Sequence, residues 1–312
     1  MVPIGTTEVW QAALAKWAEI ARNIPDLAPA VAVQQRTLRI LLDSAEQLEL
    51  DAADIPPIDS DAILGKWIRG VPAFRNEATP IPPRLKDALP ALCGVLVDSG
   101  AGEAVEHVRD ALAKGEIDAD SLLRVSLARN EKAIRTSALH MGLSPDLVWL
   151  VGELGSSPLA HYLQRRLLSR DDLARSLKDW DRGYCPCCGS WPTFIEVVNG
   201  SRLLRCSFCA ASWQLTSQRC VYCGNAGSDF VAAAPDVSRK SRRIELCGAC
   251  ASYTKVIEVT EPAPFPLLAI EDLASVDLDR GAMTREYGRP KLFDLDAIAP
   301  LPSGLGTTGD CA

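Results

Sequence analysis

The fold of this chain is decided by the stretch CPCCGSWPTFIEVVNGSRLLRCSFC, residues 185–209. A C-x-x-C pair lies at each end of it, namely Cys185/Cys188 and Cys206/Cys209. The 17 residues between the pairs contain Asn199-Gly200, the strongest short signal for a β-hairpin with a type I′ turn. A hairpin at this point brings the first pair to the second, so that four sulfurs converge.

The pattern recurs in residues 220–250, where 23 residues separate two more C-x-x-C pairs. Two residues between cysteines allow a tight turn to aim both sulfurs at one ion, and two such turns supply a tetrahedron. We therefore expect two metal sites. The first is made by Cys185, Cys188, Cys206 and Cys209, and the second by Cys220, Cys223, Cys247 and Cys250. A cross-braced arrangement, in which the first pair joins the third and the second joins the fourth, is the alternative.

Glycine supports these turns. Gly189 and Gly224 follow the second cysteine of their pairs, where a positive φ lets an amide approach the sulfur, and Gly248 lies inside the last turn. Ala210 occupies the equivalent position after the second pair. We expect that turn to differ slightly from the others.

The eleven cysteines favour metal binding over disulfides, because no export signal precedes them. A small region of short strands has little core, and structural tetrathiolate binding contributes roughly 10–16 kcal/mol to folding. Four thiolates leave no open position for a hydrolytic water, although a redox or sensing role is compatible with them. Tetrahedral sulfur suits both zinc and iron, which visible absorption would distinguish.

The remaining cysteines and the histidines are assigned no chemistry. Cys187 is expected to point outward without a role, and the alternatives are a reactive thiol or a metal ligand taken for a bystander. Cys93 should be a small buried residue, and Cys311 should be inert in the tail. The scattered histidines are expected to be packing or surface residues: His107, His140 and His161.

The first 180 residues have the periodicity of successive amphipathic helices. Gly115 and Gly142 are expected to end two of them, and Pro90 to kink another. Serine-proline pairs at 144–145 and 157–158 predict two separate helix starts. Helices are expected over residues 8–22, 31–48, 59–68, 103–114 and 171–180, and after Pro83, with one or two helices over residues 120–140.

Short strand-like runs replace helical periodicity after Gly183. They are expected over residues 191–198, 202–205, 212–216, 230–233, 243–246 and 253–259. Trp191, Trp213 and Tyr253 should pack this region rather than form a binding face. The fold class is therefore multi-domain, α with a small β part. Its expected divisions are an all-helical domain (1–180), two four-cysteine modules (181–218 and 219–261), and a linker, short helix and flexible tail (262–312).

The net charge of −7 conceals an asymmetry, because residues 181–260 carry +3. Residues 239–243, RKSRR, could meet phosphate or an acidic partner, or could be a solvated hairpin tip. No apolar window is long enough to span a membrane, and the N-terminus does not resemble a secretory signal, so a cytoplasmic location is expected. The chain shows no Walker loop, Rossmann glycines, G-x-S-x-G or H-E-x-x-H motif.

The cysteine region resembles the formate dehydrogenase accessory protein family, FdhE, in the order and spacing of all four pairs. The matching segments are CPCCGSWP (185–192), LRC (204–206), Trp213, RC (219–220), CG (223–224), ELC (245–247), Cys250, YTK (253–255), EDLAS (271–275), LD (278–279) and GRP (288–290). Cys187 and Thr254 depart from the pattern. The resemblance covers roughly residues 180–293 well and the helical part loosely.

This resemblance implies two rubredoxin-like modules after an all-helical domain, with the eight paired cysteines as ligands and iron favoured over zinc. It also implies a non-enzymatic, cytoplasmic maturation factor that contacts the catalytic subunit of a respiratory formate dehydrogenase. Two other functions remain open. One is a rubredoxin-like electron-transfer protein, which needs iron. The other is a zinc-ribbon nucleic-acid binder, which the overall acidity disfavours.

Overall fold

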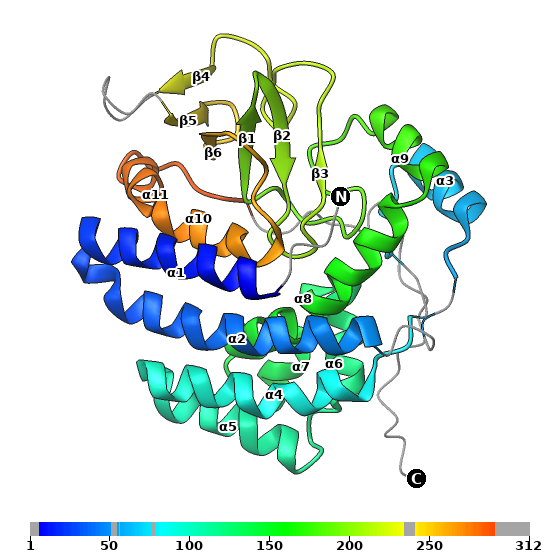
Figure 1. Ribbon diagram of the computed structural model, residues 1–312, viewed down its shortest axis with the longest axis vertical. Coiled ribbons are helices and arrows are strands. Elements are labelled where there is room, and N and C mark those ends of the chain that lie inside the picture. The colour runs from blue at the N-terminus through cyan, green and yellow to red at the C-terminus, as the bar shows by residue number, and fades with distance from the viewer. Residues whose placement is uncertain (1–5, 51–54, 56, 76–78, 234–240, 291–312) are drawn as a thin grey trace.

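The computed structural model describes residues 6–50, 55, 57–75, 79–233 and 241–290. Its helical first part and the small sheet that follows are stacked on one another in Figure 1. The helices of the first part are α1 (Thr6–Asn23), α2 (Ala28–Leu50), α3 (Ser60–Ile68), α4 (Pro83–Leu96), α5 (Gly102–Ala113), α6 (Ala119–Leu127), α7 (Glu131–His140), α8 (Pro145–Leu168) and α9 (Asp171–Ser176).

The helix boundaries follow from local side-chain chemistry. Asp59, Asp118 and Asn130 precede α3, α6 and α7, and each side chain accepts a hydrogen bond from a backbone amide of the first turn. Gly115 and Gly142 follow α5 and α7 with φ of 74° and 68°, as expected for glycines that end helices. Helix α4 continues through Pro90 as far as Leu96.

The prediction of a helix start at Ser157-Pro158 is wrong, because Pro158 lies inside α8. A proline deprives the carbonyl four residues earlier of its backbone donor. Here that carbonyl belongs to Leu154, and the hydroxyl of Ser157 donates to it at 3.0 Å. The serine therefore supplies the hydrogen bond that the proline removes, and one helix runs through both residues.

Helix α8 is the centre of the helical part and packs against α2, α4, α6 and α7. Gly155 makes this packing close. A Cβ at that position would lie 2.5 Å from Leu89 of α4 and 2.9 Å from Leu123 of α6.

The strands of the described chain form one six-stranded sheet in the order β3-β2-β1-β6-β5-β4. They are β1 (Phe194–Val198), β2 (Ser201–Arg205), β3 (Ser212–Trp213), β4 (Phe230–Ala233), β5 (Arg242–Cys247) and β6 (Ser252–Val259). Asn199 and Gly200 join β1 to β2 with φ of 48° and 80°, which confirms the predicted hairpin turn. All six predicted strands are present, although β3 is shorter than expected.

The two four-cysteine regions share this sheet. Strand β1, which follows the first cysteine pair, runs parallel to β6, which follows the last pair. The helical first part and the small sheet confirm the predicted fold class. The expected divisions at residues 180, 218 and 261 remain predictions.

The segment after the sheet returns to the helical part. It contains η5 (Phe265–Leu267), α10 (Leu268–Ala274) and α11 (Val276–Met283). The one short helix predicted for this segment corresponds to α10. Leu267 and Ile270 pack with Trp17 of α1, and Figure 1 shows α10 between α1 and the strands. The predicted flexible tail lies outside the described residues. No described helix is both long and apolar enough to cross a membrane.

Candidate metal centres

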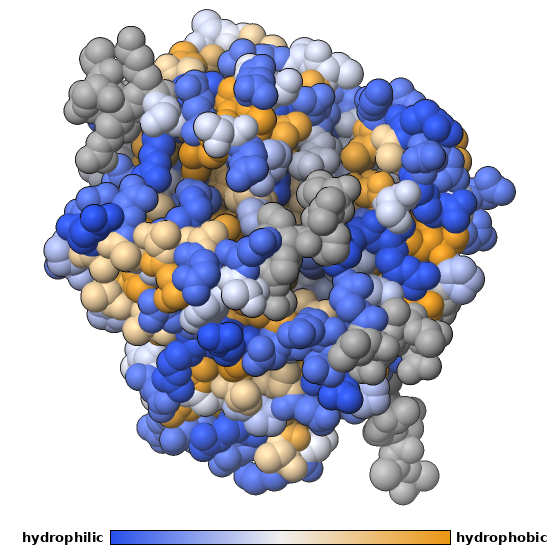
Figure 2. Space-filling view, viewed as in Figure 1, coloured by the Kyte–Doolittle hydropathy of each residue, from blue (hydrophilic) through white to orange (hydrophobic). Residues whose placement is uncertain are grey.

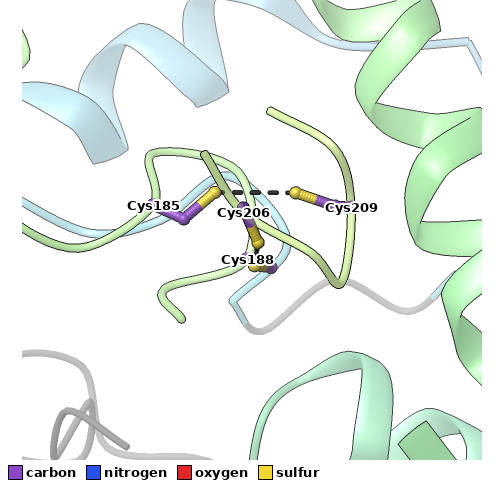
Figure 3. A group of neighbouring side chains, drawn as sticks. All are labelled: Cys185, Cys188, Cys206 and Cys209. Carbon is purple, nitrogen blue, oxygen red and sulfur yellow. Dashed lines mark hydrogen bonds between the residues drawn. The ribbon is translucent and has the colours of Figure 1, made fainter. Parts of the chain in front are cut away.

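The first predicted cysteine set converges in space. Figure 3 shows the side chains of Cys185, Cys188, Cys206 and Cys209 pointing toward one another from two separate turns. The Sγ atoms of Cys185 and Cys209 are 3.6 Å apart, and those of Cys188 and Cys206 are 3.5 Å apart. All four sulfurs lie within 4.8 Å of one another, and all four residues are buried.

The second set converges in the same way. Its sulfurs also lie within 4.8 Å of one another, with Cys220 and Cys250 at 3.7 Å and Cys223 and Cys247 at 3.6 Å. The two groups are those predicted from the hairpin spacing, and the cysteine pairs are not cross-braced.

These separations fit a tetrahedral ion. A metal–sulfur bond of about 2.3 Å gives a tetrahedron with edges of roughly 3.8 Å. The observed separations of 3.5–3.7 Å are close to that edge, so each group could hold a metal ion. Four thiolates suit zinc and iron equally in geometry, so the structure does not choose between them.

All four turns share one backbone feature. The residue after each second cysteine has a positive φ: Gly189 (89°), Ala210 (61°), Gly224 (77°) and Ala251 (51°). In the first three turns, the amide of that residue donates to the carbonyl of the first cysteine at 2.9–3.0 Å. The expectation that Ala210 would alter its turn is therefore wrong, because that residue adopts the left-handed conformation despite its methyl group.

The first group is attached to the helical part through its backbone. The amides of Ala73 and Phe74 each donate at 2.8 Å, to the carbonyls of Pro186 and Cys187 respectively. The indole of Trp67 also donates to the Pro186 carbonyl, at 2.9 Å. The first turn is therefore fixed by residues more than a hundred positions earlier in the chain, which no local pattern could have predicted.

Cys187 does not point outward as predicted, because it is 0 % exposed. The Phe74 amide donates a hydrogen bond to the Cys187 carbonyl, so the helical part covers the side of the turn that was expected to face solvent. Hydrogen bonds with the thiols of Cys185 and Cys209 lower the pKa of Cys187 to about 6, although burial acts in the opposite direction. Cys93 is buried as predicted, and burial raises its pKa to about 11. Cys311 lies outside the described residues.

The thiols of the first group differ in the direction in which their pKa values are shifted. Burial raises the pKa of Cys185, Cys206 and Cys209 well above the usual range. Burial also acts to raise the pKa of Cys188, but hydrogen bonds from neighbouring thiols and the positive charge of Arg129 lower it well below that range. The helical part therefore contributes a cation to this group, and Arg129 was not identified from the sequence.

The second group is nearer to solvent. Cys223 is exposed and Cys250 is partly exposed, whereas Cys220 and Cys247 are buried. Burial acts to raise the pKa of Cys247, but hydrogen bonds with Cys250 and Cys223 lower it to about 7. The side-chain amide of Asn225 lies 3.9 Å from the Cys247 sulfur. The two groups thus share geometry but differ in their access to solvent.

The aromatic residues near the turns serve mainly as packing. Trp213 is buried at 2 % exposure and its indole donates to the Arg182 carbonyl at 2.9 Å. Trp191 lies edge-on between Tyr184 and Tyr222, with ring centroids 6.0 and 5.1 Å away. The hydroxyl of Tyr253 donates to Asp279 at 2.7 Å. These contacts confirm the packing role predicted for the three residues.

No protein-family model matches the chain. It is 28 % identical over 243 residues to an FdhE homologue of Aquifex aeolicus, covering 74 % of this chain and 76 % of that protein. It is 30 % identical over 123 residues to FdhE of Escherichia coli, where the match spans 38 % of this chain and 39 % of that protein.

A solved structure has the same fold. The crystal structure of the FdhE protein from Pseudomonas aeruginosa superimposes with a TM-score of 0.59 at 18 % identity, and covers 95 % of this chain and 97 % of that one. At 18 % identity this match shows that the two chains share a fold. Together with the sequence matches, it confirms the resemblance of this chain to the FdhE family.

Proposed function

We propose that the chain is a cytoplasmic accessory factor that binds the catalytic subunit of a respiratory formate dehydrogenase and supports its assembly or activation. In this proposal it has no catalytic activity of its own and uses two tetrathiolate metal sites. The observation that carries it is the convergence of two four-sulfur groups in a chain similar to one FdhE homologue over 74 % of its length.

The chemistry of the two groups supports a structural or redox use of the metal. Eight cysteines would act as ligands: Cys185, Cys188, Cys206 and Cys209 for one ion, and Cys220, Cys223, Cys247 and Cys250 for the other. Four protein sulfurs complete a tetrahedral ion and leave no position for a substrate or an activated water. Iron is the favoured metal because of the family resemblance, and zinc is the alternative.

No single apolar face identifies the partner surface. Among the described residues, the exposed large apolar side chains lie on separate elements: Leu14 on α1, Ile68 on α3, Leu139 on α7, Val231 on β4 and Met283 on α11. Figure 2 shows hydrophilic residues interspersed with smaller apolar areas on the face it presents. Scattered apolar residues of this kind are ordinary, so the proposal rests on the metal groups and the relatives.

A co-purification experiment tests the proposal. The tagged chain, purified without oxygen from cells that express the dehydrogenase catalytic subunit, is expected to retain that subunit. The variant Cys188→Ser should retain less of it, whereas Cys93→Ala, which changes a cysteine outside both groups, should behave like the unmodified chain. Failure to retain the catalytic subunit in any state of its maturation would rule the proposal out.

Electron transfer is a second candidate, and the exposure of Cys223 favours it. An iron tetrathiolate that reaches the surface can exchange one electron with a partner. Protein that takes up only zinc from iron-replete cells would exclude this function.

The described part of the basic segment does not favour nucleic-acid binding. Residues 239 and 240 lie outside the described residues. Arg242 donates to the Ala274 carbonyl at 2.7 Å, and Arg243 pairs with Glu258 at 2.8 Å. These side chains therefore hold the fold together.

A further inference from the structure

The positively charged side chain of Arg129 is buried between the helical part and the first cysteine group. It lies in the loop between α6 and α7, and its side chain is only 4 % exposed. Its guanidinium carbon lies 4.2 Å from the ring centroid of Phe208, which stands between Cys206 and Cys209 in the sequence. On another side it lies 4.7 Å from the ring centroid of Trp149. The two rings hold the guanidinium against the turn that carries half of the first group.

The backbone of Arg129 supports a functional placement. Its φ is 57°, a left-handed conformation that a residue with a side chain adopts at a cost of roughly 1 kcal/mol or more. The loop keeps this conformation while the Arg129 amide donates to the Ser126 carbonyl at 2.9 Å.

The hydrogen bonding of the guanidinium is incomplete. Nη2 donates to Glu153 at 2.8 Å, but Nε and Nη1 are buried and have no hydrogen-bond partner among the described residues. A buried, charged donor without a partner is costly, and native structures rarely leave one. Two nitrogens of this cation, which carry three N–H donors, are therefore buried next to the Phe208 turn without an acceptor in the described part of the chain.

The thiolates of a metal-loaded first group supply the negative charge that a buried cation at this place requires. Four thiolates around a divalent ion carry a net charge of −2, or −1 around a ferric ion, and burial makes such a charge costly unless a cation offsets it. The pKa of Arg129 is raised: burial acts against this, but the charges of Glu153, Cys188 and Cys206 outweigh it. The positive charge of Arg129 and the thiols of Cys188 and Cys206 therefore attract one another, across the Phe208 turn that the guanidinium contacts.

We propose that Arg129 is a positioning residue of the first metal site, where its buried guanidinium offsets the negative charge of the bound tetrathiolate. This inference rests on the metal sites proposed above, but not on the formate dehydrogenase partner. Through Arg129, metal binding at the first site stabilises the contact between the helical part and the sheet.

Metal competition in the full-length protein tests this role. Chain loaded with two zinc ions is titrated with a chromogenic chelator, and Cys188→Ser identifies the release phase that belongs to the first site. Loss of a residue that supports the ligands from outside the coordination sphere typically weakens metal affinity by about 10–100-fold. We expect this loss at the first site for Arg129→Met, a smaller loss for Arg129→Lys, and no change at the second site. The control is Arg135→Met, on α7, which removes an arginine paired with Glu131 and Asp146.

The midpoint potential of the first site, measured in iron-loaded protein, is a second readout. A purely structural role of Arg129 would leave it unchanged. Removal of the cation by Arg129→Met should make the midpoint potential of the first site more negative, because the cation favours the more negative ferrous state. Glu153→Gln should shift it in the opposite direction, because that change removes the anion that competes for Arg129. Since Glu153 is partly exposed at the surface of α8, this second variant remains informative if Arg129→Met does not fold.

Each possible result either supports the role of Arg129 or overturns it. Selective weakening of the first site and potentials that move in opposite directions support the inference. Equal weakening of both sites, the same behaviour in Arg129→Met and Arg135→Met, unchanged potentials, or a first site that takes up no metal would overturn it. None of these results depends on the co-purification that tests the proposed partner.

Discussion

Gly183 lies directly against the carbonyl of Val221, so closely that a Cβ on the glycine would be 1.6 Å from that oxygen. Gly183 precedes the first cysteine pair, whereas Val221 lies inside the third pair, between Cys220 and Cys223. The entry to the first group and the first turn of the second group are thus in van der Waals contact, and only glycine fits between them.

We predict that Gly183→Ala destabilises the chain by about 3 kcal/mol, at the upper end for overpacking, because the obstacle is backbone and cannot rotate away. The displaced turn should also release metal from the second site. Chemical denaturation and metal content measure the two effects. Gly94→Ala is the matched control: nothing lies within 4 Å of its Cβ, and alanine favours a helix interior. Equal stability of the two variants would contradict the contact.

The unequal exposure of the two groups predicts the order in which metal is lost. The first group is fully buried, whereas Cys223 of the second is exposed. A chelator should therefore empty the second site first, and a thiol reagent should modify Cys223 before any cysteine of the first group. Time-resolved mass spectrometry of the partly stripped protein locates the labelled cysteine. Simultaneous release of both ions would show that the exposure difference has no kinetic effect.

Ala251 adopts a φ of 51° although glycine would do so without strain. Its side chain is exposed, so a change to glycine removes little packing. The relief of left-handed strain exceeds the entropic cost of glycine, and Ala251→Gly should stabilise the chain by about 0.5 kcal/mol. Thermal unfolding at fixed metal load measures it. Ala210→Gly should gain less, because the methyl of Ala210 packs against the core of the sheet. A lower unfolding temperature for Ala251→Gly would contradict the strain argument.

We predict that the chain loses folding stability in acid because of His161. Burial, and then the charge of Arg165, lower the pKa of this residue from 6.5 to about 4. Between these values the unfolded chain binds more protons, so the folded state is fully favoured above pH 6.5 and loses stability as the pH falls toward 4. For a partly exposed ring the loss is about 2 kcal/mol.

The variant His161→Phe removes this titration and retains an aromatic ring for the stack on Phe265, whose centroid is 4.3 Å away. Denaturant unfolding at pH 7.5, 6 and 5, at matched metal content, compares the two proteins. On acidification the wild-type chain should lose stability relative to His161→Phe. Parallel pH profiles would show that His161 does not contribute.

The local features of the cysteine region could be predicted from the sequence because they are short-range. The Asn199-Gly200 turn fixes the register of β1 and β2, and the C-x-x-C spacing fixes the turns that aim the sulfurs. The same reasoning failed at Ser157-Pro158, where a side-chain hydrogen bond replaced the missing backbone bond. It also failed at Ala210, where the turn outweighed the preference for glycine.

Features that depend on distant parts of the chain could not be predicted. The burial of Cys187 follows from the hydrogen bond between its carbonyl and Phe74, more than a hundred residues earlier. The parallel pairing of β1 with β6 joins the first and last cysteine turns into one sheet. The position of Arg129 beside the first group requires α6, α7 and α8 to be assembled. No periodicity or spacing in the sequence encodes these contacts.

The central claim is that eight cysteines form two separate tetrathiolate sites, and metal counting by native mass spectrometry tests it most directly. Anaerobically purified protein should carry two ions per chain, one for each group. Cys188→Ser and Cys223→Ser should each lose one of the two ions, and Cys93→Ala should keep both. A reduced, folded wild-type chain that binds no metal under saturating zinc or iron would contradict the account, as would single-cysteine variants that lose neither ion.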